Sequence, residues 1–200
     1  MTKIVELIID ENSEENQDGV FAISLVESPA MESDFIALSK EEKKVEVKFA
    51  TQDKEKQLLT GAVLIPNKQI LRVDKESGSD YYVYFSKDTI RKASELFMMN
   101  NYQSNHTIHH KSELKHLTVV ESWIKDNPID KSVRYGFEKL PEGTWFVSVK
   151  VNDKSVWDDY VKTGKVKGFS IEGYFTDKME LSEDEITLEK IKEIIKKGKY

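Results

Sequence analysis

Short runs of apolar residues, each bounded by polar turns, predict that most of this chain folds into β-strands. The clearest run spans Trp145 to Val151, where apolar residues occupy every second position, the period of a strand with one buried face. A continuous apolar run from Leu58 to Ile65 predicts another strand. Other runs of apolar and strand-favouring residues predict strands at 4–9, 20–26, 81–85, 106–110, 117–125, 134–138 and 165–176.

Three segments instead predict helices. Ser86 is a suitable N-cap for a helix that carries Ile90, Ala93 and Phe97 on one face and ends near Asn100. The other two are a short helix within 152–164 and a final helix within 181–200, which begins with a Ser-x-x-Glu capping box. The predicted fold class is therefore α+β, in which a mostly antiparallel sheet or small barrel is flanked by helices.

A change in composition divides the chain near residue 57. Residues 39–57 are rich in Lys and Glu and poor in large apolar residues, a pattern typical of a solvated linker. We predict an N-terminal leader and linker over 1–57, the main domain over 58–180 and a C-terminal helix over 181–200. Such a leader buries too little apolar area to offset its ordering entropy, so we expect it to be removable. The alternative is that residues 20–26 add an edge strand to the main sheet.

The composition argues against several classes of function. The chain of 200 residues has 36 acidic and 30 basic side chains, and its net charge of −6 disfavours binding to nucleic acid or to anionic membranes. The absence of cysteine excludes disulfides, thiolate metal sites and a cysteine nucleophile. The sequence has no glycine-rich phosphate loop and no run of about 20 apolar residues. We expect a cytoplasmic protein without a cofactor, in which a hydroxyl group supplies any nucleophile.

All four histidines lie within one window of eleven residues, from His106 to His116. If residues 105–110 form a strand, His106 and His110 share one face and His109 lies on the other. This cluster has three interpretations. It is a His-rich surface strand, a zinc site formed by His106, His110 and His116, or the source of a general base for a serine nucleophile.

Ser170 is the candidate nucleophile. It lies between Phe169 and Ile171, whose side chains would anchor the opposite face of the strand in the core. Gly168 and Gly173 allow close approach of another backbone. The spacing differs from the Gly-x-Ser-x-Gly elbow, because residue 172 is Glu, so an α/β-hydrolase is not indicated.

Four stretches of the chain resemble the prohead serine proteases of tailed phages, in particular the XkdF-like branch. These stretches are Thr-Ile-His-His at 107–110, Thr-Val-Val-Glu-Ser-Trp-Ile at 118–124, Pro-Glu-Gly-Thr-Trp at 141–145 and Gly-Lys-Val-Lys-Gly-Phe-Ser-Ile-Glu-Gly at 164–173. Residues 20–38 are also similar to the segment that precedes this domain in such proteins. The resemblance extends over about residues 58–178. It implies a fold similar to that of herpesvirus assemblins, with a β-barrel surrounded by helices and the serine and histidine on neighbouring strands.

The resemblance also implies the roles of individual residues. Ser170 would be the nucleophile and His110 the general base, with His109 as the fallback if the register differs by one residue. The third catalytic residue is less defined by the resemblance. We favour Glu121, because a carboxylate on a buried strand needs a partner such as an imidazole N–H. Glu172 and Asp177 are the alternatives, and Glu180 is a further carboxylate after Ser170.

The function implied by the resemblance is a serine endopeptidase of capsid maturation. Its substrates would be phage scaffold and major capsid proteins, and it would act in the host bacterial cytoplasm, inside the assembling prohead. Cleavage of the chain itself after Glu27 and self-association are further expectations. The competing interpretation is a non-catalytic capsid- or scaffold-associated structural protein that keeps the protease fold, because a fold does not fix an activity.

Overall fold

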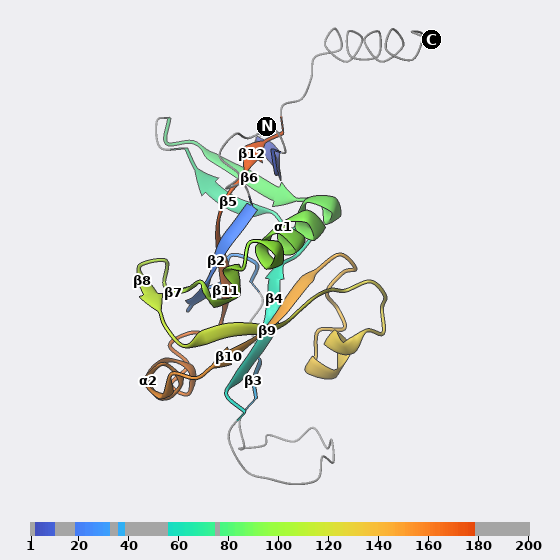
Figure 1. The fold of residues 1–200 in the computed structure, drawn as a ribbon. Helices are drawn as coiled ribbons and strands as arrows, with labels where there is room; N and C mark the ends of the chain where they lie inside the picture. The colour runs from blue at the N-terminus through green and yellow to red at the C-terminus, as the bar shows by residue number, and fades with distance from the viewer. Residues whose placement is uncertain (1–2, 11–18, 33–35, 39–55, 75–76, 179–200) are drawn as a thin grey trace, which may run out of the picture.

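The described residues form three four-stranded sheets, which make the framework of the fold (Figure 1). The computed structural model describes residues 3–10, 19–32, 36–38, 56–74 and 77–178. The first sheet has the order β12-β1-β6-β5, and its strands are β12 (Thr176–Asp177), β1 (Ile4–Ile8), β6 (Asp80–Phe85) and β5 (Ile70–Val73). The second, β11-β2-β7-β8, consists of β11 (Gly168–Tyr174), β2 (Gly19–Val26), β7 (His106–Ile108) and β8 (Ser112–Leu114). The third, β3-β4-β10-β9, consists of β3 (Ile36–Leu38), β4 (Leu58–Leu64), β10 (Trp145–Val151) and β9 (Leu117–Ile124).

Most strand pairs are antiparallel, and the exceptions among the described pairs are β1 with β6 and β2 with β7. The sheets do not close into a barrel within the described part of the chain. The fold is therefore α+β and sheet-dominated, as the sequence predicts, in its open-sheet form rather than as a small barrel.

Helical segments make up a smaller share of the described residues than strands do. They are α1 (Lys87–Met99), η1 (Tyr102–Ser104), η2 (Lys131–Tyr135), α2 (Lys154–Val156) and η3 (Trp157–Val161). The prediction for α1 is confirmed, since the Ser86 hydroxyl accepts the Thr89 N–H at 3.3 Å and Ile90, Ala93 and Phe97 are buried. The strand predicted at 134–138 is wrong. That segment belongs partly to η2, which Asp130 caps by accepting the Ser132 N–H at 2.8 Å.

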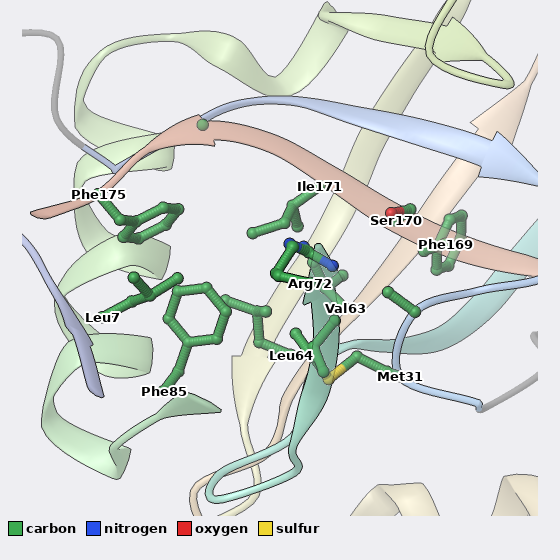
Figure 2. A pocket seen from close by; sticks show the side chains of 13 residues that line it. Leu7, Met31, Val63, Leu64, Arg72, Phe85, Phe169, Ser170, Ile171 and Phe175 are labelled. Carbon is green, nitrogen blue, oxygen red and sulfur yellow. The ribbon is translucent and has the colours of Figure 1, made fainter. Parts of the chain in front are cut away.

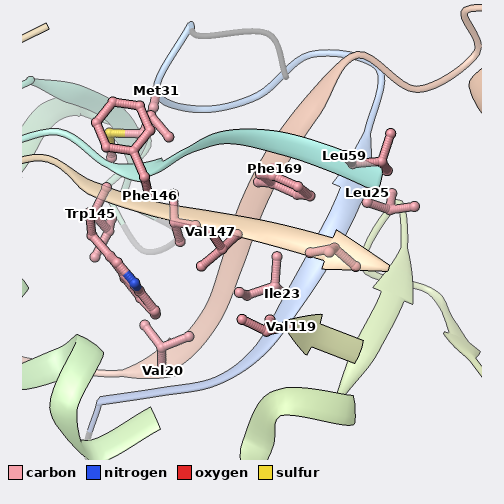
Figure 3. Close-up of a cluster of buried hydrophobic side chains, with 14 of the residues drawn as sticks. Val20, Ile23, Leu25, Met31, Leu59, Val119, Trp145, Phe146, Val147 and Phe169 are labelled. Carbon is pink, nitrogen blue, oxygen red and sulfur yellow. The ribbon is translucent and has the colours of Figure 1, made fainter. Parts of the chain in front are cut away.

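The main core lies between the second and third sheets (Figure 3). Ile23, Leu25 and Phe169 reach it from the second sheet, and each is fully buried. Leu59, Val147 and Val149 reach it from the third sheet. Helix α1 closes one end, where the ring of Phe97 meets that of Trp145 edge to face at 5.5 Å. One face of β11 and β2 is therefore fixed in the core, and the opposite face carries the residues between the core positions.

The described part of residues 1–57 contributes one strand to each of the three sheets, β1, β2 and β3. β2 lies between β11 and β7, and its residues Val20, Ile23 and Leu25 are buried in the core. It is a central strand, not the edge strand of the alternative interpretation. Glu27 is exposed directly after β2. Most of the predicted linker and the predicted helix within 181–200 lie outside the described residues.

None of the helices in the described ranges is both long and apolar enough to span a membrane.

Candidate active site

A β-turn in the three-residue loop between β7 and β8 carries His109 and His110. β7 ends at Ile108, and the Lys111 N–H donates to the Ile108 carbonyl at 3.0 Å, so that His109 and His110 form the tip of the β7–β8 hairpin. Both have left-handed backbones, with φ of 52° and 57°. Tight hairpin turns of this kind favour Gly, which has no Cβ, and Asn, which tolerates a positive φ better than most residues. A positive φ is costly for other side chains. A strained backbone at two adjacent histidines is typical of a functional site. The strand predicted over 106–110 is therefore too long, because β7 ends at Ile108 and the turn follows.

Ser170, Ser24 and Thr107 lie in one row across the second sheet. Ser170 pairs with Ser24 between β11 and β2, and Ser24 pairs with Thr107 between β2 and β7. Their neighbours Phe169 and Leu25 point into the core (Figure 3). Since side chains alternate along a strand, the three hydroxyl groups lie on the outer face of the sheet.

The histidine turn reaches over this outer face. The His110 N–H donates to the Ser24 hydroxyl oxygen at 3.0 Å, so His110 lies above the central strand β2. From there its ring extends to β11, where Nδ1 lies 3.2 Å from Oε1 of Glu172. The Thr107 hydroxyl donates to the same carboxylate oxygen. Glu172 therefore has two partners, one from the turn and one from β7.

Ser170 and Glu172 are two residues apart on β11 and face the same side of the sheet. His110 contacts Glu172 and lies above β2, the strand that pairs with β11. No hydrogen bond joins the Ser170 hydroxyl to the His110 ring in the described part of the chain. Such contacts are often long before substrate binds, so the arrangement suits a serine and a general base that lie on the same surface.

Glu172, not Glu121, is the carboxylate that the structure places beside His110. Glu121 lies on β9 in the third sheet, where it accepts the Ser148 hydroxyl at 2.7 Å and meets Lys131 Nζ at 3.3 Å. Asp177 lies on β12 in the first sheet, paired with Leu7. Glu180 falls outside the described residues. The arrangement thus favours one of the alternatives over the carboxylate that the sequence interpretation preferred.

His106 has a structural environment. It is 1% exposed, and its ring nitrogens face two backbone carbonyls, Nδ1 that of Ile23 at 3.2 Å and Nε2 that of Gln103 at 3.0 Å. Its position conflicts with the zinc interpretation, which requires His106, His110 and His116 to converge. Across the described ranges, no three His, Asp or Glu side chains gather in a way that could hold a metal ion.

The buried imidazole makes stability depend on pH. Burial lowers the pKa of His106 and outweighs the two carbonyl contacts, which would raise it. Between the lowered pKa and the ordinary value of about 6.5, the unfolded chain binds more protons than the folded one. The free energy of unfolding should therefore fall as the pH drops through about 6.5. Urea titrations at a series of pH values measure this slope.

The variant His106→Asn should flatten this pH dependence below pH 6.5, although it also removes buried contacts. His116→Asn, at an exposed histidine, is the matched control and should keep the wild-type slope. An unchanged slope in His106→Asn would show that other groups cause it.

A pocket of about 220 Å³, lined mostly by residues with apolar side chains, lies beside β11 (Figure 2). Ser170 lines it together with side chains from the first and third sheets, including Leu64 and Phe85, and Ile171 points into it. Arg72 is the charged residue among those that line it. Phe169 and Ile171 face this pocket, whereas the Ser170 hydroxyl lies on the opposite face of β11, so the pocket and the candidate nucleophile are on different sides of the strand.

Sequence reasoning did not identify Thr107 and Ser24 as site residues. Thr107 belongs to the Thr-x-x-His pattern that indicates His110, but only the pairing of β7 with β2 shows that its hydroxyl meets Glu172. Ser24 looks like an ordinary strand serine in the sequence. Its place between Ser170 and Thr107 depends on strand register, which one sequence does not reveal.

Comparison with known proteins gives one match. The family model described as "Putative phage serine protease XkdF" matches residues 45–180, which is more than half of the chain. The matched range contains the histidine turn and β11, whereas β1, β2 and β3 precede it. Searches among curated proteins and among solved structures found no match.

Proposed function

Because this chain belongs to the XkdF family of phage serine proteases, we propose that it is a serine endopeptidase with Ser170, His110 and Glu172 as its catalytic residues. The observation that carries this proposal is the contact between His110 Nδ1 and Glu172 Oε1 at 3.2 Å, on the face of the sheet that also carries Ser170. A carboxylate that orients an imidazole beside a serine is the arrangement expected of a hydrolytic triad.

The proposed reaction follows from this geometry. Glu172 accepts the N–H at Nδ1, so the other ring nitrogen of His110 carries no proton in the neutral ring. That nitrogen takes the Ser170 hydroxyl proton while Oγ attacks the carbonyl carbon of the peptide bond. When the C–N bond breaks, His110 returns the proton to the leaving amine. Water then attacks the ester between Ser170 and the substrate in the same way, which releases the acid and restores the serine.

The proposed substrates are phage scaffold and major capsid proteins, cut inside the assembling prohead in the bacterial cytoplasm. The match to the phage serine protease family supports a phage protease. Co-expression with the scaffold and capsid proteins of the same phage tests this proposal. Mass spectrometry should find new chain ends with the wild type and none with Ser170→Ala. Intact partners in both cultures would favour a non-catalytic structural protein.

Glu172→Gln separates the two candidate carboxylates. The amide keeps the size of the side chain but loses the charge that stabilises the imidazolium, and it can orient the ring in the wrong tautomer. We expect kcat/KM to fall by about 10²- to 10⁴-fold. Glu121→Gln should leave kcat/KM within about twofold, since Glu121 lies on β9 of another sheet, where it contacts Ser148 and the η2 residue Lys131. The reverse order of effects in peptide cleavage assays would restore Glu121 as the third residue.

A further inference from the structure

Ser24 is a buried polar residue that precedes the segment matched by the family model. It lies at the middle of β2, its exposure is 0%, and the matched residues begin at position 45. A buried hydroxyl group must find hydrogen-bond partners, because an unpaired one costs free energy. The partners of Ser24 therefore show what the hydroxyl does.

The two partners of the Ser24 hydroxyl are in β7 and in the histidine turn that follows it. Its oxygen accepts the N–H of His110 at 3.0 Å, and it donates to the carbonyl of Thr107 at 3.4 Å. One hydroxyl therefore joins β7 to the second residue of the turn. The same serine pairs with Ser170 on its other side. Ser24 lies between the candidate nucleophile and the candidate base.

The His110 N–H needs this partner because of the conformation of the turn. A φ of 57° directs the His110 backbone onto the outer face of the sheet, and the N–H points at Ser24. The bond to Ser24 satisfies this N–H and offsets part of the cost of the left-handed backbone. It also fixes the point from which the His110 ring reaches Glu172.

We propose that Ser24 is a positioning residue that holds His110 in its catalytic orientation. The inference rests on the proposed function, in which His110 is the general base. It means that β2, which lies outside the matched family segment, completes the catalytic site as well as the core. Without the hydroxyl, the turn loses its anchor on the sheet, and the His110 ring samples positions away from Glu172 and Ser170.

Three variants test the proposal. Ser24→Ala removes the hydroxyl, and Ser24→Thr keeps it. Ser148→Ala is the matched control, because Ser148 is also a buried strand serine whose hydroxyl is bonded, to Thr60 and Glu121 in the third sheet. Two readouts are needed. One is kcat and KM in peptide cleavage, and the other is the ¹⁵N NMR signals of the His110 ring, which do not depend on proteolysis.

Ser24→Ala should lower kcat by about 10- to 100-fold with little change in KM, consistent with a misplaced base. It should also shift the ring ¹⁵N signals of His110. Ser24→Thr should restore both, and Ser148→Ala should change neither. Equal losses of kcat in Ser24→Ala and Ser148→Ala, with His110 signals as in the wild type, would overturn the proposal.

If Ser24→Ala does not fold, amide hydrogen exchange of the His110 N–H in the wild type still tests its bond to Ser24. The His110 N–H should exchange more slowly than an unprotected amide, and exchange at the unprotected rate would overturn the proposal. If the wild type cleaves no substrate, the proposed function fails. The exchange and NMR measurements would still decide whether Ser24 positions His110.

Discussion

Ser170→Ala should lower kcat/KM by about 10⁴-fold or more while the protein stays folded, and His110→Ala should lower it by a similar factor. The first variant removes one hydroxyl from the outer face of β11, opposite the core, so the packing of Phe169 and Ile171 is unaffected. The double variant should be no slower than either single variant, because the two residues act as one unit. Peptide cleavage kinetics, with circular dichroism to confirm folding, measure these effects.

His109→Ala is the control for the choice of histidine. His109 occupies the first position of the turn, and its N–H donates to the Leu25 carbonyl at 3.0 Å, a contact that alanine keeps. We expect a milder loss than in His110→Ala. If His109→Ala is the more damaging of the two, His109 is the base and the assignment of His110 is wrong. Unchanged cleavage by Ser170→Ala would end the serine protease hypothesis.

Deleting residues 1–57 should abolish cooperative folding. The deletion removes β2 from between β11 and β7, and it removes β1 and β3 from the other two sheets. The remaining strands would expose apolar side chains and unpaired backbone groups, both of which promote aggregation. We expect an insoluble product, or a soluble one without a cooperative transition in thermal unfolding followed by circular dichroism.

Point variants also test whether the N-terminal strands stabilise the fold, through their effect on the free energy of unfolding. Leu25→Ala should cost about 2–5 kcal/mol, because Leu25 of β2 is fully buried in the main core. Leu71→Ala is the matched control, since Leu71 on β5 is 50% exposed, and it should cost less than about 1 kcal/mol. A soluble fragment 58–200 with a sharp transition, together with a small effect of Leu25→Ala, would show that the N-terminal strands are dispensable.

The sequence predicts the elements whose signal is local. The alternation from Trp145 to Val151 predicts β10, and the Ser86 cap with helical spacing predicts α1; both are present. The histidine turn was missed, because His-His lacks the Asn or Gly that marks such turns. The central position of β2 was missed for a different reason. Strand order and register depend on contacts between distant parts of the chain.

In the candidate site too, some residues follow from local sequence motifs and others only from the fold. The motif resemblance indicates Ser170 and His110, and the structure places them on one face of one sheet. The choice among Glu121, Glu172 and Asp177 requires knowing which strand lies near His110, and spacing in the sequence does not supply this. Only the packed turn shows that the imidazole reaches β11 rather than β9.

Labelling with a fluorophosphonate probe tests the central claim most directly. Such a probe reacts with a serine that a neighbouring base activates, so it reports on the catalytic unit without knowledge of the substrate. Peptide mapping by mass spectrometry should place the adduct on Ser170 in the wild type. Labelling should be lost in Ser170→Ala and strongly slowed in His110→Ala and Glu172→Gln. An adduct on another serine, or equal labelling of Ser170 when His110 is replaced, would contradict the proposed catalytic site.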